Sequence, residues 1–215
     1  MQYFYRIILL YLLTISAAHA MHILGGQVDP PLCDTLGKAY GCLAVNFQRV
    51  IKPGDAEKLR EKLADINKIS PHDFRVGMIY LNSPGGDVME AMKIGHLIRD
   101  EQMSTFVPHD FTCASACALL LAAGVTRGAA GPLIIHSFYS PEFLGSGDFA
   151  DANRQFDKIS QAIRDYLKQM RVPATLLDEM LKIPFYKQKQ LTIDEQAKYG
   201  LLGIDPVYAI VRKSK

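Results

Sequence analysis

Hydrophobic and polar residues follow two different periods along the middle of the chain. Between residues 56 and 69, apolar Leu59, Leu63 and Ile66 recur at helical spacing among charged residues, which predicts an amphipathic helix. Residues 76–81 (VGMIYL) are instead continuously apolar and run into NSPGG at 82–86, as expected of a buried strand that stops at a tight loop. Helical spacing returns over residues 88–98. This segment therefore predicts a strand, a loop and a helix in succession.

The same succession recurs further along the chain. Strands are predicted at 103–107 and 133–135, and a strongly apolar helix is predicted at 115–123 between them. Strands that alternate with helices form parallel sheets with helices packed on their faces, so the fold class is α/β. Functional groups collect at the carboxyl ends of such strands. We therefore expect segments 83–87, 112–115 and 136–139 to converge.

The two ends of the chain have other patterns. Residues 21–45 lack periodicity and carry Gly and Pro pairs, so we expect an irregular arm there. A long helix is predicted over 151–170, and a further helix is expected to begin near Pro173. Thr192 and Glu195 have the spacing of a capping box, which predicts a short helix to about Lys198, stopped by Gly200. A last strand is predicted at 207–211.

The first twenty residues have the pattern of a signal peptide. Arg6 provides a positive charge, residues 7–17 are almost continuously apolar, and the AHA sequence at 18–20 fits the small residues that signal peptidase requires. The apolar run is short for a membrane span. We expect cleavage after Ala20 and export to the periplasm or the medium, and an uncleaved N-terminal membrane anchor is the alternative.

Composition narrows the function classes. A chain of 215 residues with 49% hydrophobic residues suits one globular domain with a proper core. The 24 basic and 22 acidic residues leave a net charge of only +2, which offers no electrostatic attraction for nucleic acid. We therefore expect no nucleic-acid partner.

The four cysteines are interpreted in the light of export. In an oxidising compartment their spacing favours the pairs Cys33–Cys42 and Cys113–Cys117, although four cysteines allow three connectivities. A metal site is the alternative for the second pair, because His109, Cys113 and Cys117 recur every fourth residue. That spacing matches no common zinc pattern, so we expect neither a metal nor another cofactor.

Three features together indicate serine hydrolase chemistry, which needs a hydroxyl, a neutral base and N–H donors for an oxyanion. Ser115 lies among small residues at the start of a predicted helix, His136 follows a predicted strand directly, and Gly85 and Gly86 allow the backbone to approach a ligand closely. Each feature alone has a commoner explanation: a helix cap, a satisfied polar residue and a plain turn. Their order along the chain is what favours catalysis.

Four segments carry a family resemblance: IYLNSPGGDVMEA at 79–91, CASACALLLAAG at 113–124, LIIH at 133–136 and EQAKYGL at 195–201. In this order they resemble the proteolytic subunit of the Clp protease and its exported ClpP-like relatives. The resemblance implies a ClpP/crotonase-like β-α superhelix with a parallel sheet and C-terminal helices. We expect this hydrolase domain at 73–215, preceded by an arm and first helix at 21–72.

The resemblance also implies roles for matching positions. Ser115 corresponds to the nucleophile, His136 to the general base, and the N–H groups of Gly86 and Ala116 to the oxyanion hole. A peptide or protein substrate would lie extended beside the strand end formed by Pro84, Gly85, Gly86 and Asp87. A homo-oligomer is compatible with the family. An ATPase partner is not expected, because the exported compartment lacks ATP and the preceding segment does not resemble the family's docking loops.

The chain departs from the family at the third catalytic position. Gln188 stands where the family has an aspartate, and a glutamine cannot stabilise an imidazolium by charge. Asp194 is the nearest acidic substitute, but its place in the capping box favours a capping role. We therefore predict a Ser115–His136 dyad. A weak or inactive ClpP-like peptide-binding protein is the alternative function, and acyl-CoA chemistry of the crotonase kind is a third.

Overall fold

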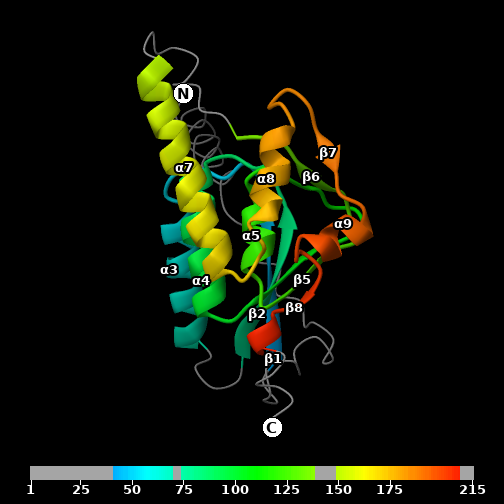
Figure 1. The fold of residues 1–215 in the computed structure, drawn as a ribbon. Coiled ribbons are helices and arrows are strands. Elements are labelled where there is room, and N and C mark those ends of the chain that lie inside the picture. Colours follow the sequence, from blue (N-terminus) through cyan, green and yellow to red (C-terminus); the bar gives the residue numbers. More distant parts are fainter. Residues whose placement is uncertain (1–40, 70–73, 139–148, 209–215) are drawn as a thin grey trace, which may run out of the picture.

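The computed structural model describes residues 41–69, 74–138 and 149–208. Helices and strands alternate through most of this range (Figure 1). The strands are β1 (Gly41–Gln48), β2 (Phe74–Asn82), β3 (Ser104–Val107), β4 (Cys113–Ala114), β5 (Thr126–Ala129), β6 (Leu133–Ile135), β7 (Lys189–Gln190) and β8 (Gly203–Ile204). The helices are α3 (Asp55–Ile69), α4 (Val88–Asp100), α5 (Cys117–Ala123), α7 (Phe149–Gln169), α8 (Thr175–Lys182) and α9 (Ile193–Lys198).

The main sheet has five strands in the order β1-β2-β3-β5-β8 and is parallel except at the β5–β8 edge. β2 lies inside the sheet between β1 and β3, and Met78, Ile79 and Leu81 on it are all at most 2% exposed. Side chains on both faces of β2 are therefore buried, which explains the continuous apolar run in the sequence. The α/β fold class with a mostly parallel sheet is confirmed.

The prediction of an irregular arm through residue 45 is wrong for residues 41–45. β1 begins at Gly41 and pairs with β2 along its whole length, from Gly41 opposite Phe74 to Gln48 opposite Asn82. The segment 44–47 (AVNF) is buried throughout, including Asn46 at 8% exposure. Apolar and polar residues alternate only over residues 45–48 (VNFQ), which is too short a run to distinguish a strand from a loop.

The C-terminal prediction is also corrected. Val207 and Tyr208 belong to a short helical segment that begins at Pro206, and the last strand is β8, at Gly203–Ile204. The remainder of the predicted strand, 209–211, lies outside the described residues. The capping box, by contrast, is confirmed: the Thr192 hydroxyl accepts from the Glu195 N–H, and the Glu195 carboxylate accepts from the Thr192 N–H.

A second sheet has three strands in the order β4-β6-β7, and its strands β4 and β6 lead into Ser115 and His136. β4 and β6 are parallel, and β6 and β7 are antiparallel. Helix α5 directly follows β4, and all seven of its residues are at most 1% exposed. A helix that is apolar on every side is stable only when other elements surround it, so α5 lies in the core and gives the turn before it a rigid support.

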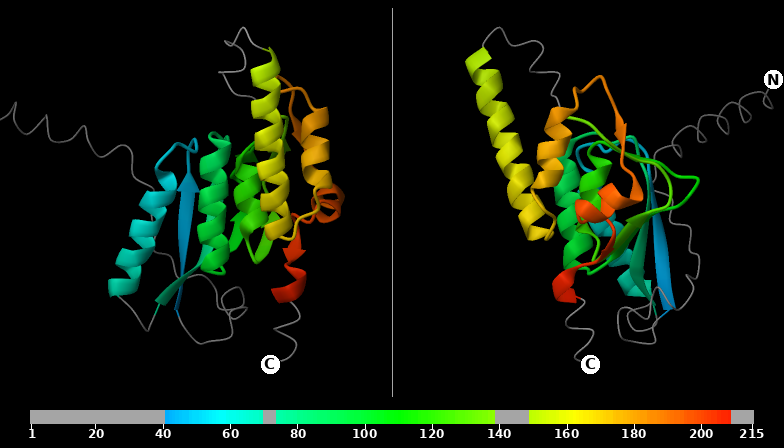
Figure 2. Two further views of the ribbon diagram at one scale, coloured as in Figure 1. Left: turned by 60° about the vertical axis from the view of Figure 1, so that its left-hand side comes forward. Right: turned by 45° about the vertical axis from the view of Figure 1, so that its right-hand side comes forward.

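The remaining helices cover this centre. α3, α4 and α7 run side by side along one flank of the molecule, and α8 and α9 lie over the second sheet (Figure 1). Tyr166 of α7 is buried and donates to the Leu119 carbonyl of α5 at 2.7 Å, and Gly95 of α4 leaves room for its hydroxyl. The N-terminal end of α7 extends beyond both sheets (Figure 2). No helix in the described ranges is long and apolar enough to cross a membrane.

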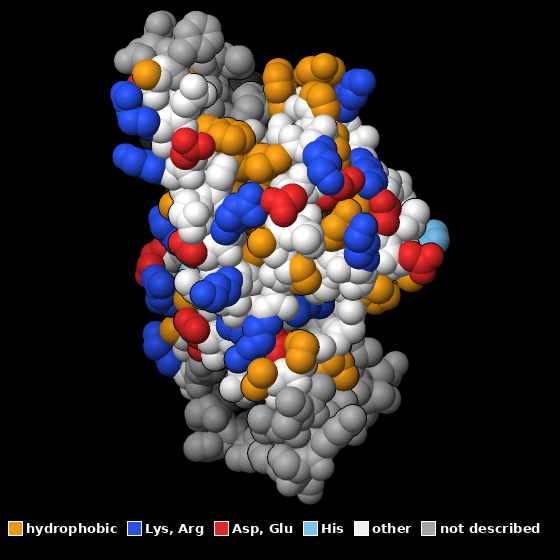
Figure 3. Space-filling model, in the orientation of Figure 1, with side chains coloured by type: hydrophobic (Ala, Val, Ile, Leu, Met, Phe, Trp, Pro, Cys, Tyr) orange, Lys and Arg blue, Asp and Glu red, His pale blue; other side chains and the backbone are white. Residues whose placement is uncertain are grey.

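The face shown in Figure 3 mixes acidic and basic side chains without a field of one sign. Hydrophobic side chains gather at its upper edge, over the loop between α8 and β7. Phe185 and Tyr186 of that loop are 42% and 71% exposed and pack edge to face with ring centroids 5.4 Å apart.

Candidate active site

The three segments expected to converge do lie side by side. Ser83, just past the end of β2, forms a parallel bridge with Cys113, and the Ala114 N–H donates to the Ser83 carbonyl at 2.9 Å. On its other side β4 pairs with β6, with Ala114 opposite Ile134. The Ser115 N–H then donates to the Ile134 carbonyl at 2.9 Å. These hydrogen bonds place Ser115 between the glycine loop and the strand that ends at His136.

Ser115 adopts a left-handed backbone conformation, with φ at +56°. It is not the first residue of a helix, as the sequence suggested, but occupies the turn between β4 and α5, which begins at Cys117. A non-glycine residue in this conformation is strained, and such strain concentrates at functional sites. Ser115 is partly exposed, whereas Ala114 and Ala116 on either side are buried. Ser115 is therefore the residue of this turn that reaches the surface.

Gly85 is pressed against this turn. A Cβ atom on Gly85 would lie 2.7 Å from the Ala114 carbonyl oxygen, 2.8 Å from the Ser115 Cβ and 3.0 Å from the Ala116 nitrogen. Its φ is +97°, a region that other residues rarely adopt. Only glycine allows the loop to approach Ser115 this closely. The same contact brings the Ala116 N–H next to the Gly85–Gly86 segment.

Gly86 is fixed from the opposite side by Ile51, in the loop after β1. The Ile51 N–H donates to the Gly85 carbonyl at 2.8 Å, and the Asp87 N–H donates to the Ile51 carbonyl at 3.0 Å. In a parallel pairing, the residue that lies between the two bonded positions directs its own N–H and C=O away from the partner strand. Here that residue is Gly86. The Gly86 N–H therefore points away from Ile51, and no partner for it, or for the Ala116 N–H, is found among the described residues.

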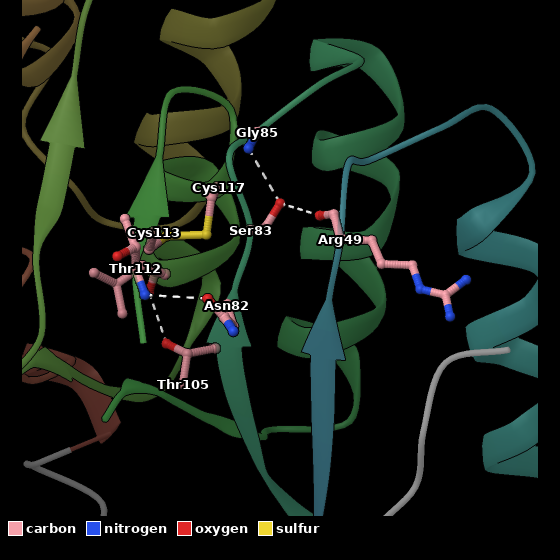
Figure 4. The surroundings of a disulfide bond; sticks show 9 residues. Arg49, Asn82, Ser83, Gly85, Thr105, Thr112, Cys113 and Cys117 are labelled. Carbon is pink, nitrogen blue, oxygen red and sulfur yellow. Dashed lines mark hydrogen bonds between the residues drawn. A yellow bond between two sulfur atoms is a disulfide. The ribbon is translucent and has the colours of Figure 1, made fainter. Parts of the chain in front are cut away.

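A disulfide joins Cys113 and Cys117 and brackets the Ser115 turn, as one of the two expected pairs (Figure 4). Both sulfur atoms are thereby removed as thiolate ligands, so the metal site with His109 is wrong, and His109 itself is highly exposed. Cys33 and the side chain of Cys42 lie outside the described residues, so that pairing stays a prediction.

His136 directly follows β6 and is partly buried. Its Nδ1 lies 2.8 Å from the carbonyl oxygen of Ser137. Because a carbonyl only accepts hydrogen bonds, Nδ1 must carry the hydrogen, and a neutral ring then keeps its lone pair on Nε2. Among the described residues no hydrogen bond joins the Ser115 hydroxyl to this ring. Catalytic hydrogen bonds are often long in a free enzyme and shorten only when substrate is bound.

Gln188 directly precedes β7, next to the last pair of residues that joins β7 to β6. The pairing of β6 with β7 ends at Ile135 opposite Lys189, and His136 and Gln188 are the next residues on the two strands. The Ser137 N–H then donates to the Ile183 carbonyl at 2.9 Å, so the regular register does not continue beyond His136. Gln188 is exposed, in the turn before β7. Asp194 is exposed in the first turn of α9. No carboxylate is hydrogen-bonded to the His136 ring within the part of the chain that the structure describes.

Ion pairs hold the β7 strand next to this site. The Lys189 ammonium lies 2.7 Å from a carboxylate oxygen of Glu179 on α8 and 2.7 Å from one of Glu195 on α9. Hydrogen bonds from Lys189 and Lys182 lower the pKa of Glu179 to about 2, and the hydrogen bond to Glu179 raises the pKa of Lys189. β7 is thus tied to two helices, and its position opposite β6 does not depend on backbone pairing alone.

Two contributors to the site have no signal in the sequence. Ile51 fixes the glycine loop through backbone atoms alone, so its side-chain identity does not reveal the role. The Ser137 carbonyl orients His136 in the same way. A third contributor, Ser83, belongs to the NSPGG segment: its buried hydroxyl donates to the Arg49 carbonyl and accepts from the Gly85 N–H at 3.1 Å (Figure 4).

Comparison with known proteins agrees with this geometry. The family model of the Clp protease matches residues 36–209, which include β1 and every segment of the site. No match to the chain is found among curated proteins. ClpP-like proteins typically bind peptides and form oligomers, and a serine peptidase-like function goes with the family. The chain belongs to the Clp protease family.

Proposed function

We propose that this protein is an exported serine peptidase that cleaves peptides through an acyl-Ser115 intermediate, without ATP. The observation that carries the proposal is the turn at Ser115: a serine with φ at +56° lies between a glycine loop and the strand that ends at His136. A helix cap or a surface turn needs neither the strained conformation nor the two neighbouring segments.

The reaction begins when the Ser115 hydroxyl attacks the carbonyl carbon of the scissile peptide bond. His136 Nε2 accepts the hydroxyl proton, and the carbonyl oxygen becomes an oxyanion that accepts hydrogen bonds from the Gly86 and Ala116 N–H groups. The intermediate then collapses, the C–N bond breaks, and the imidazolium gives its proton to the leaving amine. Water, activated by His136 in the same way, hydrolyses the acyl-enzyme.

The imidazole is oriented by a backbone carbonyl in place of a carboxylate. The Ser137 carbonyl oxygen lies 2.8 Å from Nδ1 and accepts its hydrogen, which selects the tautomer that a general base needs. A carbonyl dipole stabilises the imidazolium less than a full negative charge does. We therefore expect turnover to be slow compared with that of a complete triad.

The substrate is an extended peptide that pairs with the segment Pro84–Asp87. Ile51 occupies one edge of this segment, and the edge that carries the Gly86 N–H and C=O is the one available for main-chain pairing. Such pairing is tolerant of side-chain sequence. Neither a metal nor a cofactor takes part in the proposed steps.

Export is proposed from residues 1–20, whose charge, apolar run and AHA sequence fit a signal peptide. The disulfide at the site fits an oxidising compartment, because buried cysteine pairs persist as disulfides there and are reduced in the cytosol. A cytoplasmic unfoldase is then not a partner, and self-association of the peptidase is the assembly we propose.

The proposal is tested by hydrolysis of a set of fluorogenic peptides by the mature protein and by three variants. Ser115→Ala and His136→Ala are expected to remove activity, and Ser137→Ala is the control, because only its backbone carbonyl is used. Activity that is equal in wild type and Ser115→Ala would show that another group, or a contaminant, performs the reaction.

A further inference from the structure

Glu90 carries a buried carboxylate that the proposed reaction does not use. It lies in the first turn of α4 and is 3% exposed. Its Oε1 accepts from the N–H groups of Gly54 at 3.0 Å and Ala56 at 2.8 Å, and its Oε2 accepts from Lys93 at 3.1 Å. A residue of α4 thus satisfies two free N–H groups at the start of α3, more than thirty residues away.

The segment that Glu90 holds is the one that fixes the glycine loop. Ile51 lies three residues before Gly54, and its N–H and C=O bond to Gly85 and Asp87 on either side of Gly86. There is no free space in this contact, since a Cβ on Gly86 would lie 2.2 Å from the Ile51 carbonyl oxygen. A shift of the loop at Ile51 must therefore shift Gly86.

The other end of the same segment is held by Ser83. Its hydroxyl bonds to the Arg49 carbonyl and to the Gly85 N–H, and it is 1% exposed. Figure 4 shows this hydroxyl between the two backbone groups, with the Arg49 side chain directed away. Residues 49–56 are thus held at both ends by buried side chains, by Ser83 of the glycine loop at one end and by Glu90 of α4 at the other, with Ile51 between them.

We infer that Glu90 is a positioning residue for the Gly86 oxyanion donor. This inference rests on the proposed function and adds a group to it that does not touch the substrate. The Glu90 carboxylate holds residues 54–56 against α4. Ile51, three residues before Gly54, is thereby kept in place, and its backbone bonds set the direction of the Gly86 N–H.

The expected effect is on the chemical step. Loss of one oxyanion donor costs about 100- to 1000-fold in kcat, and a misplacement of about 1 Å costs up to about 100-fold. Glu90→Ala leaves the Gly86 N–H present but displaced, so kcat per active site is expected to fall about 10- to 100-fold. KM is expected to change far less, because the oxyanion exists only on the way to the transition state.

The experiment compares Glu90→Ala, Glu90→Gln and Ser83→Ala with wild type. Active sites are counted by exhaustive labelling with a fluorophosphonate, and kcat per site, KM, thermal unfolding and the affinity for a peptide aldehyde are measured. The aldehyde forms a tetrahedral adduct, so its affinity is expected to fall by the same factor as kcat. Glu90→Gln keeps an oxygen for the Gly54 and Ala56 N–H groups and should restore most of kcat. Glu57→Ala, at an exposed site of α3, is the control.

The result that overturns the inference is a Glu90→Ala protein that melts at a lower temperature but keeps wild-type kcat per labelled site and wild-type aldehyde affinity. That combination means that Glu90 only stabilises the fold. If Glu90→Ala does not fold, Ser83→Ala gives the decision, because it releases the other end of the same segment: unchanged kcat per site overturns the inference, and a fall in kcat at constant KM supports it. Failure of the proposed function is distinct, since wild type itself would then take up no more probe than Ser115→Ala.

Discussion

Replacement of Gln188 by aspartate should increase the rate of peptide hydrolysis. Residue 188 and His136 flank the last pair of the β6–β7 ladder, Ile135–Lys189, and one further step in the register would set them opposite each other. Cβ atoms of directly opposite residues lie about 4.5–5.5 Å apart, so an aspartate there is within reach of the imidazole. Gln188→Asp thus adds the negative charge that the dyad lacks.

The size of the effect follows from Coulomb's law. Opposite unit charges 4 Å apart attract by about 4 kcal/mol at an effective dielectric constant of 20 and by about 1 kcal/mol in water. Position 188 is exposed, so the lower part of this range applies. An interaction of about 1.4 kcal/mol with the imidazolium that forms in the transition state raises the rate of hydrolysis by about tenfold.

The assay is the pH dependence of kcat/KM for one fluorogenic peptide between pH 5 and pH 9. Gln188→Asp is expected to raise the plateau of kcat/KM about tenfold. Gln188→Asn is the matched control, because it has the shape of aspartate without its charge. Equal profiles for the two variants would show that residue 188 does not face His136 and would refute the register argument.

Three further predictions concern the surroundings of the site. Gly85→Ala, whose Cβ would meet the Ala114 carbonyl oxygen at 2.7 Å, is expected to lower kcat at least about 100-fold in the peptide assay, and wild-type kcat would contradict the close packing. Removal of the disulfide in the double variant Cys113→Ala/Cys117→Ala is expected to lower the free energy of unfolding in urea by about 2 kcal/mol and to reduce turnover. Turnover that survives proven opening of the bond would show that the turn keeps its shape without it. Asp205→Asn removes the buried carboxylate that pairs with Arg99 and Arg171 at 2.9 Å each, and it is expected to lower the free energy of unfolding by about 3 kcal/mol at pH 7.

The pH dependence of that last effect has a definite sign. Burial raises the pKa of Asp205. The hydrogen bond from the Tyr208 N–H and the charges of Arg99 and Arg171 together lower this pKa by more than burial raises it, so the folded value lies below the ordinary 3.8. The stabilisation is therefore complete above pH 3.8 and is lost as the pH falls through the lower folded value. Urea unfolding of wild type and Asp205→Asn should show a difference that shrinks in this window, and a constant difference would contradict the ion-pair explanation.

Local sequence was sufficient where local physics decides the structure. The apolar run of β2, the glycine loop and the helical spacing of α4 are contiguous, so one stretch of sequence predicts all three. The capping box at Thr192 and Glu195 is likewise a short-range pattern, and the structure confirms it. The parallel order of the strand ends then brings the candidate residues together, as strand–helix alternation predicts.

Contacts between distant segments decide the rest. β1 forms a strand because it pairs with β2, more than thirty residues later, and its own sequence alternates only over residues 45–48. The left-handed conformation of Ser115 results from packing against Gly85 and from the bond to Ile134, neither of which is near in sequence. Glu90 shares the helical spacing of the buried Ile94 and Ile98, and only the fold shows which groups its carboxylate meets there, namely the N–H groups at the start of α3.

The account depends most directly on which atom forms the covalent intermediate. Treatment of the mature protein with a fluorophosphonate, followed by mass spectrometry of its peptides, measures this in one step. We predict a single adduct on Ser115, which disappears in Ser115→Ala and forms much more slowly in His136→Ala. An adduct on another side chain, or none in a folded protein that has the Cys113–Cys117 bond, would contradict the account.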